Sequence, residues 1–172
     1  MEEEFVVLVD GSDNAIGRAP KLQAHRQGLL HRAVSVFVFR PSGELLLQRR
    51  ALEKYHSGGL WANTCCGHPR PGEPPEEAAK RRLYDEMGLV CSLKRSFSFV
   101  YEAVVQGGLT EHEFDHVFIG TTTGEPVPDA REVQEWRWIS PVELARELAE
   151  APDAFAAWFS PALQGVLARG VI

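Results

Sequence analysis

Short runs of apolar and β-forming residues recur along the chain between clusters of turn formers, a pattern typical of β-strands. Residues 5–9 form an apolar run that breaks at a cluster of turn formers over residues 10–14, which predicts a strand followed by a turn. Residues 33–40 and 45–48 are rich in strand formers and flank a Pro-Ser-Gly turn, so they predict a β-hairpin.

A second hairpin is expected further along the chain. Residues 97–105 and 109–121 carry strand formers on both sides of a Gln-Gly-Gly turn, and residues 135–139 predict one more short strand. Between residues 52 and 72 the hydrophobic residues follow neither the strand nor the helix period, and glycines and prolines recur. This stretch predicts a long ordered loop, and loops of that length in compact domains are commonly functional.

Residues 74–87 carry the clearest helix signals. The segment begins at a proline, places Glu76 and Glu77 in its first turn, where the helix dipole favours acidic side chains, and meets Gly88 at its carboxyl end. A shorter helix is expected over residues 21–26, ending at Gly28.

The carboxyl-terminal region has apolar positions that suit helices. Over residues 141–167 we expect helices that break near Pro152 and near Pro161. Strands and helices together predict an α/β (α+β) fold, with a mixed sheet flanked by helices. A chain of 172 residues with 44% hydrophobic content predicts a single compact domain spanning residues 1–172.

Charge and composition exclude several classes of partner. The net charge is -6, and the lysines and arginines are scattered, so we expect neither nucleic-acid binding nor attraction to an anionic membrane. No apolar run reaches about 18 residues, so no membrane insertion is expected. The first ten residues resemble neither a secretory signal nor a transit peptide. Three cysteines cannot form a disulfide framework, which favours a reducing cytoplasm.

The segment over residues 67–89 resembles the Nudix box, a loop-helix-loop with a fixed spacing. That pattern is a glycine, five residues, a glutamate, seven residues, and then Arg-Glu-aliphatic-x-Glu-Glu-x-Gly-aliphatic. The positions that match it in register are Gly67, Glu73, Arg81, Leu83, Glu86, Gly88 and Leu89. So long a spaced pattern is rarely accidental, and it implies a Nudix-like α/β scaffold.

Two positions of the box depart from the pattern: Arg82 and Asp85 stand where it has glutamates. In Nudix hydrolases those glutamates gather Mg²⁺ ions that neutralise phosphate charge and activate a water molecule. A guanidinium opposes such a metal cluster and favours a phosphate clamp. The alternative is a solvated helix face on which Arg82 and Glu86 form an ion pair worth a few tenths of a kcal/mol.

Carboxylates and imidazoles also gather on the strand predicted over residues 109–121. Alternation places Glu111 and Glu113 on one face, about 7 Å apart along the backbone, while His112 and His116 point the other way. Paired carboxylates could bind a metal, although the pattern considered alone is more typical of an exposed edge strand with a polar face. With the imidazoles of His25, His31 and His68 they would form a mixed N/O set that suits Mn²⁺ or Zn²⁺.

Over essentially its whole length the chain resembles type I isopentenyl-diphosphate isomerases. The segments that carry the resemblance are His25 with His31, residues 61–69 (Trp-Ala-Asn-Thr-Cys-Cys-Gly-His-Pro), the arginine-bearing helix, Tyr101, residues 111–113 and residues 158–161 (Trp-Phe-Ser-Pro). The Cys-Gly-His-Pro element is the most discriminating of them. The resemblance implies an isoprenoid-biosynthetic isomerase that interconverts isopentenyl and dimethylallyl diphosphate.

Ligand roles follow from the resemblance position by position. It implies Mn²⁺ or Zn²⁺ on His25, His31, His68, Glu111 and Glu113. It implies Mg²⁺ on Glu86, arriving with the substrate, and diphosphate contacts from Lys21, Arg50, Lys54 and Arg82. One spacing departs: five residues separate His25 and His31, where the best-known members have six. We expect a small-molecule substrate and a monomer or a dimer.

Moving the double bond requires one proton to be added and another removed through a species close to a tertiary carbocation. We expect Cys66 and Glu113 to transfer these protons from opposite faces of the substrate, with Tyr101 hydrogen-bonded near Glu113. Trp158 could present its π face to the developing cation, or be an ordinary core residue. Cys65 and Cys91 are expected to be structural.

Two other functions remain open from the sequence. A Nudix pyrophosphohydrolase acting on a nucleoside diphosphate derivative would share the helix and the Mg²⁺ requirement, but it would need neither Arg82 nor a catalytic thiol. A non-catalytic metal-binding module would have no activity that substitution of Cys66 could abolish.

Overall fold

The computed structural model describes residues 4–170. The first three residues, part of the segment expected to carry no targeting signal, and the last two lie outside this range. In chain order the elements are β1 (Phe5–Val9), β2 (Ala15–Pro20), α1 (Lys21–Gln27), β3 (His31–Phe39), β4 (Leu45–Arg50), β5 (Trp61–Ala62), β6 (Cys65–Gly67), α2 (Pro75–Met87), β7 (Leu93–Val105), η1 (Gln106–Gly108), β8 (Leu109–Thr121), β9 (Val133–Ile139), α3 (Pro141–Glu150), η2 (Pro152–Ala154) and α4 (Phe159–Leu167).

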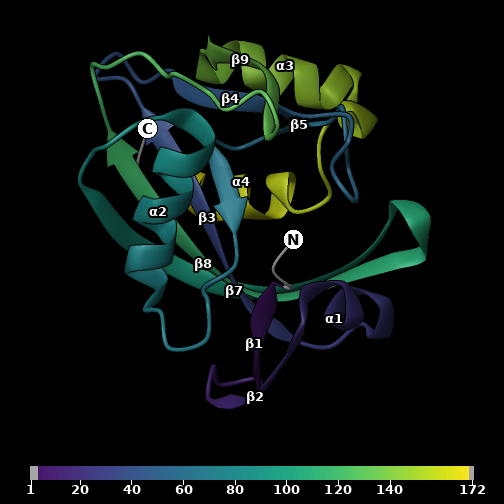
Figure 1. Cartoon of the computed structure of the whole chain (residues 1–172). Coiled ribbons are helices and arrows are strands. Elements are labelled where there is room, and N and C mark those ends of the chain that lie inside the picture. The colour runs from purple at the N-terminus through teal and green to yellow at the C-terminus, as the bar shows by residue number, and fades with distance from the viewer. Residues whose placement is uncertain (1–3, 171–172) are drawn as a thin grey trace.

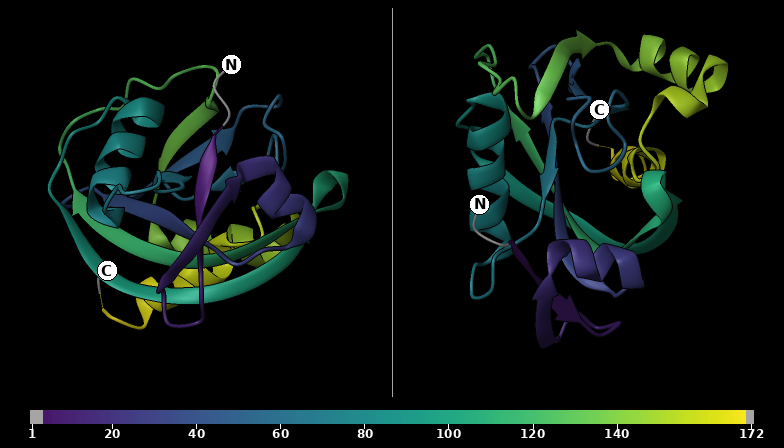
Figure 2. Two further views of the ribbon diagram at one scale, coloured as in Figure 1. Left: turned by 60° about the horizontal axis from the view of Figure 1, so that its bottom comes forward. Right: turned by 45° about the vertical axis from the view of Figure 1, so that its right-hand side comes forward.

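Strand β3 is the centre of a mixed sheet (Figure 1). It runs parallel to β8 and antiparallel to β6, β4 and β1. Strand β9 pairs with β4, and β7 pairs with β8 in a long curved hairpin (Figure 2). The expected α/β fold with a mixed sheet flanked by helices is therefore confirmed.

Helices α2 and α4 cover opposite faces of the sheet, as Figure 2 shows in its right-hand view. The period of two along β3 explains this arrangement. Val34, Val36 and Val38 pack with the Ala78 and Leu83 side of α2. Phe37 and Phe39 alternate with these valines and pack with α4, where the ring centroids of Phe37 and Phe159 lie 6.2 Å apart.

Most of the predicted elements are present, with boundaries shifted by a few residues. Helix α1 ends at Gly28 and helix α2 at Gly88, and both glycines adopt the left-handed conformation. At Gly88 a β-carbon would approach the Val127 carbonyl oxygen to 2.6 Å, so the cap also needs a residue without a side chain. No helix among residues 4–170 is long and apolar enough to cross a bilayer.

Two expectations were wrong. Pro161 does not break a helix, because α4 begins at Phe159 and a proline in the first turn has no intrahelical hydrogen bond to lose. The stretch over residues 52–72 is not wholly loop, because it contains β5 and β6, whose partners β4 and β3 are distant in the sequence. Strand β2 was not predicted, since four of its six residues are exposed in succession and show no alternation.

Candidate active site

A cavity of about 680 Å³ opens between α2, the β8 end of the sheet and the loop that joins β4 to β5. Most of the residues expected to act chemically line it: Lys21, Arg50, Lys54, Cys66, His68, Arg82, Glu86, Glu111, Glu113 and Trp158. His25, His31 and Tyr101 do not line the cavity but touch residues that do. Segments far apart in the sequence therefore meet at one place.

Imidazole nitrogens and carboxylate oxygens converge on one wall of this cavity, where His68 and Glu113 lie. His25, His31, His68 and Glu113 place ligand atoms within 4.8 Å of one another. His31 and Glu113 meet because they are directly paired at the start of the parallel β3–β8 ladder. His25 joins them from the last turn of α1, despite the short spacing to His31.

The tautomers of two histidines fit a metal site. Nδ1 of His25 donates to the Lys21 carbonyl and Nδ1 of His31 to the Leu29 carbonyl, each over 2.8 Å, so each Nε2 keeps a lone pair. Nε2 of His31 lies 3.3 Å from Nε2 of His68, which lies 3.0 Å from Oε1 of Glu113. Lone pairs this close repel unless a cation or proton lies between them, so the donor set suits a divalent metal ion.

Burial controls the protonation of this cluster. It lowers the pKa of His25, and it lowers the pKa of His68 to about 3, so both imidazoles are neutral near pH 7 and available as ligands. Burial alone would raise the pKa of Glu113, but the neighbouring His31 and His68 imidazoles hold it well below its usual range. Burial and the charge on Glu113 raise the pKa of Glu111.

Tyr101 lies opposite Glu113 in the β7–β8 ladder and contacts both carboxylates. Its hydroxyl lies 2.6 Å from Oε2 of Glu113, to which it donates, and 3.3 Å from Oε2 of Glu111. Burial, followed by the charge on Glu113, raises the pKa of Tyr101 well above its usual value. The phenol therefore stays protonated and remains a hydrogen-bond donor.

The thiol of Cys66 is oriented by Asn63, a fully buried residue between β5 and β6. The Asn63 amide nitrogen donates to the carbonyls of Val36 and Cys65 over 3.0 and 2.9 Å, which fixes the direction of the amide. Its oxygen accepts from the Cys66 thiol at 3.2 Å and from the Trp158 indole at 2.9 Å. One amide thus positions both the thiol and the indole ring.

Replacing Asn63 by alanine should lower the free energy of unfolding by about 3 kcal/mol, because two buried carbonyls and an indole N–H would lose their partners. Urea titration followed by tryptophan fluorescence measures this loss. The matched control is Asn14→Ala in the exposed β1–β2 turn, where we expect less than about 1 kcal/mol. Equal losses in the two variants would contradict the structural role of Asn63.

A second hydrogen-bonded chain reaches Cys66 from β3. The Ser35 hydroxyl donates to Oδ2 of Asp115 over 2.6 Å, and its oxygen lies 3.6 Å from the Cys66 sulfur. Burial, then the charge on Glu113, raises the pKa of Asp115 to about 8. Burial, then the Asp115 and Glu86 carboxylates, raises the pKa of the Cys66 thiol, so the free thiolate is strongly disfavoured.

Cationic side chains also line the cavity, most of them paired with carboxylates. Lys21 binds Glu4 over 2.6 Å, and Lys54 binds Glu132. The Arg50 guanidinium lies 5.2 Å from the Trp158 ring centroid. Trp158 therefore lines the cavity at the start of α4 and is not solely a core residue.

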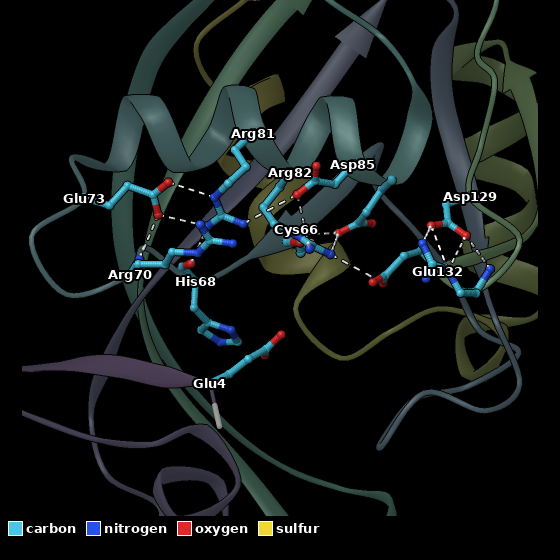
Figure 3. Close-up of polar contacts among 12 residues, drawn as sticks. Glu4, Cys66, His68, Arg70, Glu73, Arg81, Arg82, Asp85, Asp129 and Glu132 are labelled. Carbon is cyan, nitrogen blue, oxygen red and sulfur yellow. Dashed lines mark hydrogen bonds and ion pairs between the residues drawn. The ribbon is translucent and has the colours of Figure 1, made fainter. Parts of the chain in front are cut away.

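Arg82 projects from α2 over Gly67, where a β-carbon would come within 2.7 Å of the arginine side chain. Figure 3 shows it on the side of the helix where Cys66, His68 and Glu132 lie. Its guanidinium binds Oε1 of Glu86 over 2.6 Å. The ion pair considered from the sequence thus exists, but it faces a cavity and its carboxylate is buried, so it is not a solvated helix face.

Four further residues of the site had no role predicted from the sequence: Ser35, His56, Asn63 and Asp115. His56 places Nε2 3.1 Å from Oε1 of Glu111, and with His25 these residues form a second group with metal-ligand spacing. A lone histidine in an irregular loop gives no sequence signal. Asn63 was part of the segment that carried the family resemblance, but nothing in its spacing indicated four hydrogen bonds.

Comparison with known proteins identifies the scaffold. The model of the NUDIX domain matches residues 29–159. Isopentenyl-diphosphate Delta-isomerase 2 of Aromatoleum aromaticum is 50% identical over 165 residues, which are 96% of this chain and 87% of that protein. The chain belongs to the isopentenyl-diphosphate Delta-isomerase family of Nudix proteins. The family resemblance noted in the sequence is thereby confirmed.

Further similarities agree with this family. The isopentenyl-diphosphate Delta-isomerase of Burkholderia multivorans is 52% identical over 157 residues, which are 91% of this chain and 89% of that protein. Among solved structures, DR0079 of Deinococcus radiodurans superposes with a TM-score of 0.72 over 86% of this chain and 90% of that one. Its sequence identity is 22%, so this match shows the fold alone.

Proposed function

We propose that this chain isomerises isopentenyl diphosphate to dimethylallyl diphosphate. The names of its relatives describe that reaction, and the two groups that it needs face one cavity. The thiol of Cys66, the carboxylate of Glu113 and several cationic side chains all line it. That shared cavity is the observation on which the proposal rests.

The diphosphate is anchored by Lys21, Arg50, Lys54 and Arg82, and the hydrocarbon extends inward to Cys66, Glu113 and Trp158. Anchoring one end holds the double bond next to the proton-transfer groups, so the reaction becomes effectively unimolecular. One of Cys66 and Glu113 adds a proton to the terminal carbon of the alkene, which leaves a tertiary cationic carbon next to it. The other removes a proton from the methylene carbon on the opposite side of that cationic carbon, so the double bond moves to this position. The Trp158 ring stabilises the positive charge between these steps, by about 0.5 to 2 kcal/mol.

Two groups of residues in and around the cavity fit metal binding. We assign Mn²⁺ or Zn²⁺ to His25, His31, His68, Glu111 and Glu113, and Mg²⁺ to Glu86 together with the diphosphate. When bound, these ions lower the proton affinity of Glu113 and neutralise phosphate charge. Tyr101 donates to Glu113 and holds the carboxylate in place for proton transfer.

The described cysteines are all free thiols, which supports a reducing cytoplasm as the working compartment. The sequence prediction of a monomer or a dimer remains a prediction.

The deciding experiment supplies isopentenyl diphosphate and nucleoside diphosphate sugars in separate reactions with Mg²⁺ and Mn²⁺. Proton NMR should show dimethylallyl diphosphate from the first substrate and no hydrolysis of the second. Release of phosphate or of a nucleotide with no allylic product would contradict the proposal and show that the chain is a pyrophosphohydrolase. Absence of any turnover, with metal still bound, would favour the non-catalytic module.

Arg82→Gln should raise the KM for isopentenyl diphosphate about 10- to 100-fold, because a charge-assisted hydrogen bond to phosphate contributes about 1.5 to 3 kcal/mol. The turnover number should change less, since Arg82 holds the anchored end of the substrate and not the reacting carbons. Initial rates over a range of substrate concentrations separate the two constants. Arg131→Gln is the matched control, because Arg131 is 90% exposed and pairs with Asp129. An unchanged KM in Arg82→Gln would remove this residue from the diphosphate site.

A further inference from the structure

A fourth imidazole, that of His56, lies against the residues assigned to the metal. His56 is in the loop between β4 and β5, and only 3% of its surface is exposed. Its Nε2 lies 3.1 Å from Oε1 of Glu111. Its Nδ1 lies 3.0 Å from the hydroxyl oxygen of Ser57. Both ring nitrogens therefore have a partner, and the ring orientation is fixed by polar contacts.

Aromatic rings also enclose His56. The Tyr55 ring stands nearly perpendicular to it at 4.2 Å between centroids, and the Trp158 ring is perpendicular at 6.2 Å. The His25 ring lies 5.6 Å away. His56 thus lies close both to His25, a proposed metal ligand, and to Trp158, which lines the cavity.

The loop backbone is strained and pinned at this point. Ser57 is buried and has a φ of 53°, a left-handed conformation that a residue with a side chain rarely adopts. The Arg50 guanidinium donates to the His56 carbonyl over 3.3 Å, and the Leu60 amide donates to the Ser57 carbonyl over 3.3 Å. Strain of this kind persists where the surroundings over-determine it, commonly at a functional site.

We propose that His56 is a positioning residue for Glu111. In this arrangement Ser57 donates to Nδ1 of His56, and Nε2–H of His56 donates to the Glu111 carboxylate and holds it beside His25. Histidines and carboxylates that hold a metal ligand in this way commonly change metal affinity when they are replaced. The inference rests on the proposed function, because it assigns Glu111 to the metal.

Direct coordination by His56 is the alternative, and the hydrogen bonds oppose it. A metal on Nε2 would displace the contact with Glu111, and Nδ1 is already turned toward Ser57. A purely space-filling role is the other alternative. An aromatic ring of similar size between Tyr55 and Trp158 would satisfy that role, so His56→Phe separates packing from hydrogen bonding.

The test measures Mn²⁺ binding by titration followed with electron paramagnetic resonance. His56→Phe removes the N–H donor and keeps a ring, whereas His56→Gln keeps an amide donor. We expect the dissociation constant for Mn²⁺ to rise about 10- to 100-fold in His56→Phe. In His56→Gln most of the lost Mn²⁺ affinity should be recovered. His116→Gln is the control, because His116 is a buried histidine that pairs with Asp13 outside the metal cluster, and it should bind Mn²⁺ like the wild type.

Wild-type affinity in a folded His56→Phe variant would overturn the proposal, as would equal losses in the phenylalanine and glutamine variants. If His56→Phe does not fold, His56→Leu takes its place as the variant without a donor. A measurement on the wild type adds an independent criterion. With ¹⁵N-labelled histidine, electron spin echo modulation of bound Mn²⁺ should detect three imidazole ligands, and a fourth would show direct coordination and overturn the positioning role.

Failure of the proposed function gives a different result. A wild-type protein that binds Mn²⁺ in this way and shows the His56 effect, but forms no dimethylallyl diphosphate, would retain the positioning of Glu111 and lose the isomerase activity.

Discussion

Cys66→Ala should lower the turnover of isopentenyl diphosphate by about 100- to 10,000-fold, the range typical of losing a positioned proton-transfer group. The thiol lines the cavity, and the Asn63 amide oxygen fixes its direction at 3.2 Å. The neighbouring Ser35 hydroxyl does not replace the thiol, because it directs its proton toward Asp115. Proton NMR of the substrate and product measures the rate.

Cys91→Ala is the control for this experiment. Cys91 is a free thiol that packs against the α2 side of the core, away from the cavity, and its removal should leave turnover unchanged. Thermal melting should show that Cys66→Ala remains folded, since alanine loses a single sulfur atom at a half-buried position. Turnover like that of the wild type in a folded Cys66→Ala would remove the thiol from the mechanism.

Elements whose sequence signals lie within a single segment were predicted, whereas strands that depend on distant partners were not. Strands β3, β7 and β8 and helix α2 were predicted because strand formers, turn residues and capping residues are read within one segment. Strands β5 and β6 were not, because they have two and three residues and exist only through pairing with β4 and β3. A short strand held by distant partners leaves no periodic pattern of its own.

Some residues of the candidate site were likewise indicated by local sequence patterns, and others only by tertiary structure. Its Nudix-box residues and its Glu-His-Glu segment have characteristic spacing, and the family resemblance brought together histidines that are distant in the sequence. The parallel register that places His31 beside Glu113 becomes visible only in the sheet. Asn63 and His56 act through contacts fixed by tertiary structure, so residue type alone could not indicate their positions.

Glu113→Gln should reduce turnover at least as strongly as the loss of the thiol, about 100- to 10,000-fold or more, because Glu113 combines two roles. Its carboxylate accepts the Tyr101 hydroxyl proton over 2.6 Å, and its other oxygen lies 3.0 Å from Nε2 of His68. Glutamine keeps the shape and one acceptor oxygen but cannot carry a proton to or from carbon. It is also a weaker metal ligand than a carboxylate.

Excess metal separates the two roles of Glu113. We expect Mn²⁺ at high concentration to refill the metal site of Glu113→Gln without restoring turnover. A filled metal site does not replace the missing proton-transfer carboxylate. Mn²⁺ binding and product formation should be measured on the same samples, with Glu102→Gln on the exposed face of β7 as the control. Recovery of full turnover by Mn²⁺ alone would make Glu113 a metal ligand only. The second proton transfer would then have to be assigned to another group in the cavity, and Tyr101 is the first to test because its hydroxyl contacts both glutamates.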